Sequence, residues 1–318
     1  MSGVSGCPEV YAGSLEGVCR GIPRDASWGT RYPECVCRMP RGVCWRFLVM
    51  PAQAFGLPYL SPYLAVAKGP HVRIRKGVNF AVAGATAINS SFFSARKIAL
   101  WTNDSLSVQL GWFKNLKSSF CTTRQECDEY FNKSLFLVGE IGENDYNFPA
   151  LSSQSINSYM LWYHLSLEQS LVLSAYMLTE GAVDLVVPGQ LPVGCTSMFL
   201  TVFQSANESY HNNSLKQELQ NLREQYPHAR IMYADYCGAA MSIYLSPKHY
   251  RGTPRTCCGG GGPYNFNTTA VCGRTSATAY QDPSAFADWD GIHFTESAYH
   301  HIAKGVINSG FTSPPLLS

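Results

Sequence analysis

Residues 181–195 read GAVDLVVPGQLPVGC, a short apolar run followed by a loop rich in proline and glycine. The run at 182–188 predicts a buried strand, because it is apolar, of strand length and bounded by turn-forming residues. Further strand candidates lie at 78–83, 135–141 and 230–235. Helices are expected at about 155–179, 214–226 and 296–308. Buried strands that alternate with helices predict an α/β fold with a central parallel sheet and helices on both faces.

The clearest of these helices is expected at 296–308. Thr295 stands directly before it and can cap its first turn, and Gly310 follows its end. Apolar residues recur between them at intervals of three and four, which is the helical period. In parallel sheets the functional loops gather at the carboxyl ends of the strands, so we expect site residues directly after the predicted strands.

The composition is that of a globular protein with a packed core. The chain has 318 residues, of which 46% are hydrophobic and 14% charged, and its formal net charge is +2. This length allows one large α/β domain or two smaller ones. The sequence contains no basic block of the kind that binds nucleic acid or an anionic membrane surface, and no apolar run of membrane-spanning length.

Twelve cysteines and six N-x-[ST] sequons favour a secreted protein. Cys121 and Cys127 can close a local loop, and Cys257 and Cys258 precede a glycine run with Cys272 downstream. Disulfides or buried thiols are expected rather than a metal site, because no C-x-x-C pair repeats and no histidine stands at zinc-finger spacing. The sequons are at Asn89, Asn103, Asn132, Asn207, Asn212 and Asn267.

The first fifty residues differ from the rest of the chain. They contain five cysteines, six arginines and no lysine, and they show no sustained period of 2 or 3.6. Residues 1–30 have neither the basic start nor the apolar centre of a secretory signal. We therefore expect an atypical, irregular segment at 1–50, a folded domain at 51–311 and a short tail at 312–318.

Two turns that follow predicted strands carry candidate donors for an oxyanion. In GVNFAVAGATA (77–87) the strand runs into Gly84, whose amide can face a ligand without a side chain in the way. In GEIGENDYN (139–147) Asn144 follows a strand end, where its amide can donate to a developing negative charge. The alternative interpretations are a tight turn at Gly84 and an Asx turn at Asn144, both of which are common in proteins.

The stretch DWDGIHFTESAY (288–299) carries a candidate general base. Asp290 stands three residues before His293, a spacing at which the carboxylate can fix the tautomer of the imidazole and stabilise its protonated form. The alternative is a capped helix start, with Asp290 favourable near the positive end of the helix. The occurrence of this stretch after the two glycine-rich turns favours the catalytic interpretation.

Together with CCGGGGPYNFN (257–267), these stretches resemble the motifs of plant GDSL esterase/lipases in the SGNH hydrolase superfamily. The resemblance extends from about Pro51 to Phe311, and the most similar subgroup is that of acetylajmalan-esterase-like enzymes. It implies a flavodoxin-like, three-layer α/β/α sandwich. It also implies that Gly84 and Asn144 are oxyanion donors, and that Asp290 and His293 belong to a Ser-His-Asp triad.

The resemblance further implies hydrolysis of small-molecule acyl esters without a metal or an organic cofactor. It implies a secreted, glycosylated and disulfide-bonded monomer that has neither a nucleic-acid partner nor a membrane span. The sequence departs from the family in its cysteines. A shortened segment near 203–213 and Tyr280, at a position where the family has a cysteine, leave Cys195 and Cys272 without expected partners.

The F-G-D-S-L block that carries the nucleophilic serine of this family does not occur in the sequence. In VYAGSLEG (10–17), Ser14 lies on the correct side of Gly84, but the Phe and Asp of the block are missing, so we expect an ordinary serine there. The sheet is accordingly expected to lack or replace its first strand. Three functions stay open: a serine esterase or lipase, a catalytically inactive relative that binds acyl or sugar ligands, and a truncated splice or gene-model product.

Overall fold

The computed structural model forms two compact units. The sheet unit comprises residues 52–190, 209–235 and 310–318, and the loop unit includes 191–208 and 236–309. The expectations for residues 1–50, including Ser14 and the replaced first strand, lie outside the described residues. The structure describes residues 60–67, 74, 77–152, 159–202, 209–245, 250 and 254–316.

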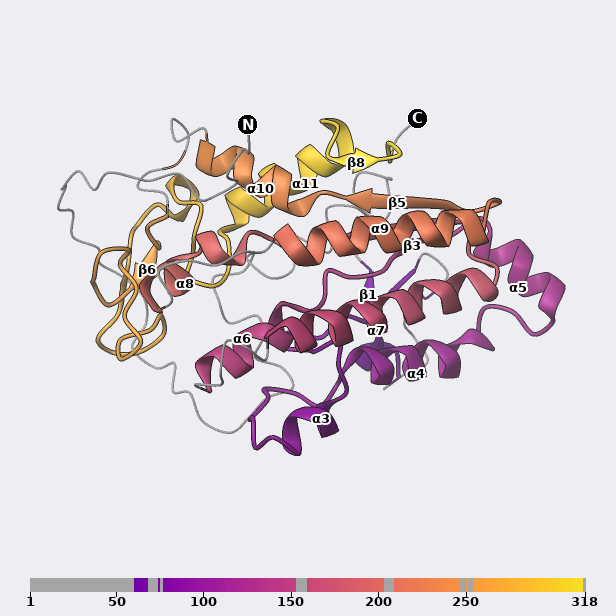
Figure 1. Ribbon diagram of the computed structural model, residues 1–318, viewed down its shortest axis with the longest axis horizontal. Helices are drawn as coiled ribbons and strands as arrows, with labels where there is room; N and C mark the ends of the chain where they lie inside the picture. Colours follow the sequence, from indigo (N-terminus) through magenta and orange to yellow (C-terminus); the bar gives the residue numbers. More distant parts are fainter. Residues whose placement is uncertain are drawn as a thin grey trace. The chain divides into compact units, whose positions relative to one another are not determined.

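A sheet of mainly parallel strands forms the centre of the sheet unit (Figure 1). Strands β3 (Leu135–Leu137), β4 (Asp184–Pro188) and β5 (Arg230–Ala234) are parallel and stand in that order. β8 (Thr312–Ser313) pairs antiparallel with β5, so the residues expected to begin the tail extend the sheet instead. β4 and β5 each lie between two neighbours and have their last four residues buried, which explains why both sequences are apolar runs.

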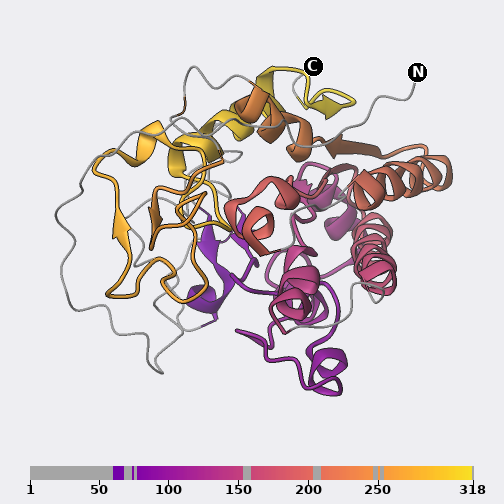
Figure 2. The same cartoon turned by 60° about the vertical axis from the view of Figure 1, so that its left-hand side comes forward.

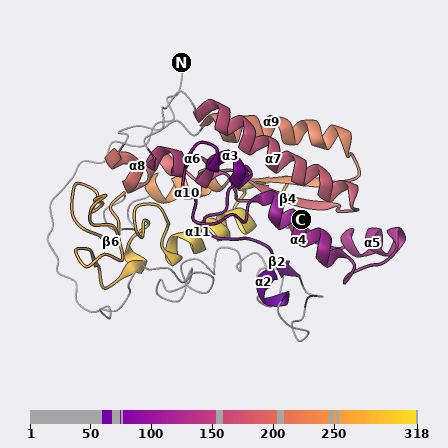
Figure 3. The same ribbon diagram turned by 90° about the horizontal axis from the view of Figure 1, so that it is seen from below.

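A second, two-stranded pairing precedes this sheet in the chain. β1 (Ser61–Pro62) and β2 (Val78–Asn79) are parallel, and helix α2 (Tyr63–Val66) follows β1 directly. In Figure 3, α2 lies beside β2. The strand predicted at 78–83 ends early because the side chain of Asn79 accepts a hydrogen bond from the Ala81 amide at 2.9 Å and turns the backbone.

Helices surround the central sheet of this unit and cover its core. The predicted helices at 155–179 and 214–226 are confirmed, with α7 and α9 lying side by side and α9 next to β5 (Figure 1). Leu185 on β4, Ile231 on β5 and Leu219 on α9 belong to one core cluster and are almost completely buried. The removal of each side chain from water stabilises the fold by about 1.5–3 kcal/mol. The helices are α3 (Ser90–Ser94), α4 (Leu106–Lys117), α5 (Arg124–Phe131), α6 (Glu143–Leu151), α7 (Tyr159–Thr179) and α9 (Ser209–Gln225).

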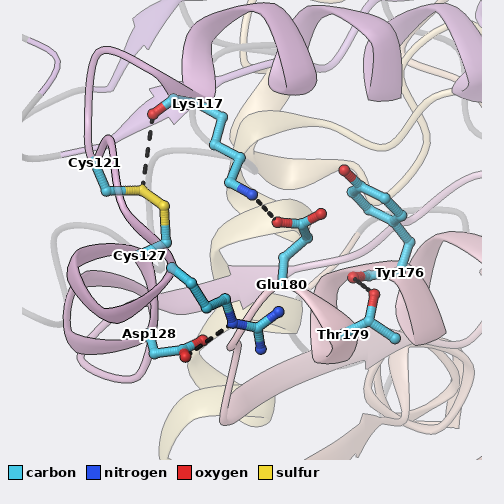
Figure 4. A network of polar contacts seen from close by, with 8 residues as sticks. Lys117, Cys121, Cys127, Asp128, Tyr176, Thr179 and Glu180 are labelled. Carbon is cyan, nitrogen blue, oxygen red and sulfur yellow. Dashed lines mark hydrogen bonds and ion pairs between the residues drawn. A yellow bond between two sulfur atoms is a disulfide. The ribbon is translucent and has the colours of Figure 1, made fainter.

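A disulfide and two ion pairs hold the corner between α4, α5 and the end of α7 (Figure 4). Cys121 and Cys127 are bonded, which confirms the local loop expected from the sequence. Lys117 pairs with Glu180, and on the exposed face of α5 Arg124 pairs with Asp128 four residues later at 2.9 Å. The disulfide closes a short loop, whereas the exposed ion pair contributes little because solvent screens it.

The loop unit consists of short elements around two packed helices. α10 and α11 lie against each other, as Figures 1 and 2 show. The predicted helix at 296–308 is confirmed: Thr295 caps it by accepting from Ala298 N at 3.3 Å, and Gly310 follows with a positive φ of 82°. The elements are η2 (Val193–Cys195), α8 (Ser197–Val202), α10 (Tyr236–Leu245), β6 (Cys258–Gly259), β7 (Thr278–Ala279), η3 (Pro283–Ala285) and α11 (Glu296–Asn308).

Two expectations about cysteines were wrong. Cys272 is bonded to Cys258, and Cys195 is also disulfide-bonded. The substitution at Tyr280 does not leave Cys272 unpaired, because the loop that follows β6 returns and places the two Cα atoms 5.3 Å apart. Spacing along the chain could not show this return.

Burial separates the sequons into usable and unusable ones. Asn89, Asn103 and Asn132 are exposed, as glycosylation requires, whereas Asn212 is 5% exposed. The Asn212 side chain accepts from Gln190 N at 2.7 Å and donates to Gln190 O at 3.1 Å inside the core, so its burial leaves no space for a glycan in the folded protein. Among the described helices, none is long and apolar enough to cross a membrane.

Candidate active site

Asp290 and His293 meet in the loop unit on one short turn before α11. Asp290 Oδ2 lies 2.9 Å from His293 Nδ1, and its other oxygen, Oδ1, accepts from the backbone amides of Ile292 at 3.0 Å and His293 at 2.8 Å. Gly291 allows this turn, since its φ is +98° and a Cβ there would lie 2.3 Å from the Phe266 ring. The carboxylate therefore holds both the backbone and the ring of His293.

The electrostatics of this pair favour an ionised carboxylate. Burial raises the pKa of Asp290, but the neighbouring His293 and the hydrogen bonds from His293 and Ile292 outweigh it, so the pKa lies below its usual value. The side chain of Asp290 is 11% exposed and that of His293 is 36% exposed. With Nδ1–H directed at Asp290, the basic lone pair of a neutral His293 is on Nε2. This is the protonation pattern of a general base that a carboxylate orients.

Asp288 supports the same turn by accepting a hydrogen bond from the Gly291 amide. The sequence did not predict this role. Its carboxylate is 1% exposed and accepts from Ser197 Oγ at 2.9 Å, Ser197 N at 3.1 Å and Gly291 N at 3.2 Å. Burial raises its pKa to about 7. Asp288 thereby ties the start of α8 to the turn that carries Asp290. The only signal in the sequence is the repeated aspartate of DWD, which does not identify Ser197 as the partner.

Asn144 and the loop after Gly84 meet in the sheet unit. Asn144 stands at the start of α6, and its Nδ2 donates to Ala85 O at 2.9 Å. Gly84 has a φ of +77° and packs under Trp101, so a side chain at this position would be strained. One proton of the Asn144 amide group is used by Ala85, which fixes the amide plane and leaves the second proton for a ligand.

Asp145, next to Asn144, clamps this loop. The carboxyl group is fully buried and accepts from Ala87 N and Ile88 N, each at 2.8 Å. Burial raises its pKa to about 7, against the opposing effect of the two amide donors. Asp145 therefore links the segment that follows Gly84 to the start of α6, where its neighbour Asn144 stands. In the sequence, Asp145 is recognisable only as part of the turn at 139–147.

The structure thus brings the four predicted site residues together as two pairs. Asp290 and His293 form one pair in the loop unit, and Gly84 and Asn144 belong to one local arrangement in the sheet unit. The first pair is joined by the 2.9 Å contact between Asp290 Oδ2 and His293 Nδ1, and the second arrangement by the 2.9 Å hydrogen bond from Asn144 Nδ2 to Ala85 O. Ser14, which the sequence predicts to be an ordinary serine, lies outside the described residues.

Comparison with known proteins identifies the family. Residues 52–306 match the family model described as GDSL-like Lipase/Acylhydrolase. The chain belongs to this family. A GDSL esterase/lipase of Arabidopsis thaliana is 45% identical over 287 residues, which cover 83% of this chain and 77% of the relative. A sinapine esterase of Brassica napus is 37% identical over 285 residues, which cover 83% of this chain and 72% of that enzyme.

The family assignment agrees with the architecture of this GDSL family member. The three-layer α/β/α class and the parallel central sheet expected from the resemblance are confirmed. Ester hydrolysis is the activity that the family and its curated relatives share by name. For the chemistry in this chain, the candidate residues are those of the Asp290–His293 turn and of the Gly84–Asn144 arrangement.

Proposed function

We propose that this GDSL family member hydrolyses carboxylic esters of small molecules by a serine-hydrolase mechanism. His293 accepts the proton of the attacking hydroxyl on Nε2, and Asp290 keeps the imidazole in the required tautomer and stabilises its cationic form. The Gly84 amide and the Asn144 side chain donate to the oxyanion of the tetrahedral intermediate. No metal ion and no organic cofactor takes part in these steps.

The observation that carries the proposal is the Asp290–His293 contact. A carboxylate that accepts three hydrogen bonds from one three-residue turn, one of them from the imidazole, is arranged around the histidine and not around the helix end. The cap of α11 is Thr295, not Asp290. The capped-helix alternative therefore leaves the position of Asp290 unexplained, whereas the general-base role explains it.

The test is labelling of the purified protein with a fluorophosphonate, peptide mapping of the adduct, and turnover of p-nitrophenyl acetate. We expect a label on one serine that is lost in His293→Ala, and a fall in kcat of about 10²–10³ in Asn144→Ala. His300→Ala, an exposed histidine on α11, is the matched control. A fluorophosphonate label that persists in His293→Ala, or a kcat in either His293→Ala or Asn144→Ala that matches the wild-type value, refutes the proposed roles.

A second candidate is a relative that binds acyl or sugar ligands without turnover, and the absent F-G-D-S-L block favours it. Catalysis would then fall by about 10⁶ relative to a complete triad. Saturable binding of an acyl ester without hydrolysis and without a fluorophosphonate label would support this candidate. A labelled serine would exclude it.

We further propose that the protein is secreted and glycosylated. The disulfides Cys121–Cys127 and Cys258–Cys272 suit an oxidising compartment, and the sequons at Asn89 and Asn103 are exposed. Expression in a plant secretory system followed by glycosidase treatment tests this, with a mass shift expected.

A further inference from the structure

A cluster of buried polar side chains lies behind the turn that carries Asn144. Its members are Tyr146 on α6, Ser166 on α7, Gln190 after β4 and His211 on α9, and none is more than 5% exposed. Buried polar groups cost free energy unless they are hydrogen-bonded, and apolar residues of the same volume would serve packing equally well. Packing alone therefore does not explain why these positions carry polar side chains.

The cluster forms a chain of contacts from α9 to the backbone of the turn. His211 Nδ1 lies 2.7 Å from Tyr146 Oη, and His211 Nε2 lies 3.5 Å from Gln190 Nε2. Gln190 Nε2 also donates to Ile141 O at 2.6 Å. Since burial lowers the pKa of His211 to about 4, its ring is neutral at physiological pH. A neutral ring that donates from Nδ1 to Tyr146 accepts from Gln190 at Nε2, so all the contacts are compatible with one tautomer.

The turn backbone rests directly on this cluster. Gly142 has a φ of +121°, and a Cβ at this position would lie 2.5 Å from Ser166 Oγ and 2.9 Å from Gln190 Nε2. Ile141, whose carbonyl Gln190 holds, is its neighbour. Asn144 follows two residues later and reaches Ala85 O. The position of Asn144 thus depends on the cluster through Ile141 and Gly142.

We propose that His211 is a positioning residue that, through Tyr146 and Gln190, holds the turn at 141–144 and keeps the Asn144 amide aimed at the oxyanion. This inference rests on the proposed function, in which Asn144 donates to the oxyanion. His211 itself touches no reacting atom. An apolar residue at position 211 removes the 2.7 Å contact with Tyr146 Oη and the 3.5 Å contact with Gln190 Nε2, so that Gln190 is held only through its bond to Ile141 O. The turn then becomes more mobile, and the Asn144 amide is no longer held in one orientation toward the oxyanion.

The first test is amide hydrogen exchange of wild type, His211→Leu and Tyr146→Phe. His228→Leu, an exposed histidine of the same unit, is the matched control. We expect exchange in the peptide 139–147 to become at least about tenfold faster in the first two variants, with β5 unchanged. Unchanged exchange at 139–147 overturns the proposal, and so does equal acceleration in β5, which would indicate general loosening.

The second test is the kinetics of p-nitrophenyl acetate hydrolysis in the same proteins. A positioning role predicts that kcat falls by about 10–100-fold while KM stays within about twofold, and that adding Asn144→Ala to His211→Leu produces little further loss. Losses that multiply independently overturn the proposal. If wild type shows no turnover, the proposed function fails, and the exchange experiment still decides whether His211 holds the turn.

Discussion

Replacing Asp145 with asparagine should destabilise the sheet unit more at pH 5 than at pH 8. The buried carboxyl group accepts from Ala87 N and Ile88 N at 2.8 Å on its two oxygens. In the variant, one of these amides faces an NH₂ group instead of an oxygen. A buried donor that loses its acceptor costs about 1–3 kcal/mol, which is a sizeable part of a typical stability of about 5–15 kcal/mol.

The pH dependence follows from the raised pKa of Asp145. In the folded protein burial raises this pKa from 3.8 to about 7, so between these pH values the unfolded chain is ionised while the folded protein keeps its proton. The folded protein then binds more protons, and its stability falls as the pH rises. Between pH 5 and pH 8 the wild type loses about 2.5 kcal/mol through this group, whereas the asparagine variant loses nothing there.

The assay is urea unfolding of both proteins, followed by tryptophan fluorescence at several pH values. The difference between wild type and variant should shrink by about 2.5 kcal/mol from pH 5 to pH 8. Other groups, such as His211 and Asp288, titrate in both proteins and cancel in the difference. Asp282→Asn, at an exposed aspartate, is the control for removing a carboxyl group. A difference that grows with pH refutes the reasoning, because the amide donors would then outweigh burial and keep Asp145 ionised.

Three further changes have expected outcomes that denaturant or thermal unfolding can measure. Gly142→Ala should lower the free energy of unfolding by at least about 2 kcal/mol, because the φ of Gly142 is +121° and Ser166 Oγ occupies the space that a Cβ needs. Gly111→Ala, inside α4 with open space around it, should raise the free energy of unfolding by about 0.5–1 kcal/mol. Equal effects at both glycines would contradict this reasoning. Replacing Cys258 and Cys272 together with serine opens a disulfide with a sequence separation of 14 and should cost about 3 kcal/mol, and an unchanged midpoint would show that the bond does not constrain the chain.

Local features of this protein were predictable because their partners are close in the chain. The helix at 296–308 could be recognised from its period and from the cap at Thr295, which bonds only three residues ahead. The same holds for Asp290 and His293, which are also three residues apart and whose contact needs only one turn. Apolar runs of strand length likewise predicted β4 and β5, since burial on both faces leaves a mark in composition.

The groups that hold the candidate donors in place were not predictable in this way. Asp145 bonds to residues 57 and 58 positions away, Tyr146 meets His211 over 65 positions, and Ser197 meets Asp288 over 91 positions. A buried hydrogen bond leaves no periodic trace in either segment, because a single polar residue in an apolar stretch is compatible with many partners.

The candidate catalytic residues of this chain can therefore be recognised from short motifs. The residues that hold those motifs in place can be identified only from the packing of segments that are distant in sequence. The amino-acid order is sufficient for a parallel α/β fold and for a turn that joins Asp290 to His293, since both depend on hydrophobic period and near neighbours. The clamp at Asp145, the strand at Thr312–Ser313 and the Cys258–Cys272 bond depend on how far segments return through space. Such returns arise from the collective burial of a whole core, which no single stretch of sequence encodes.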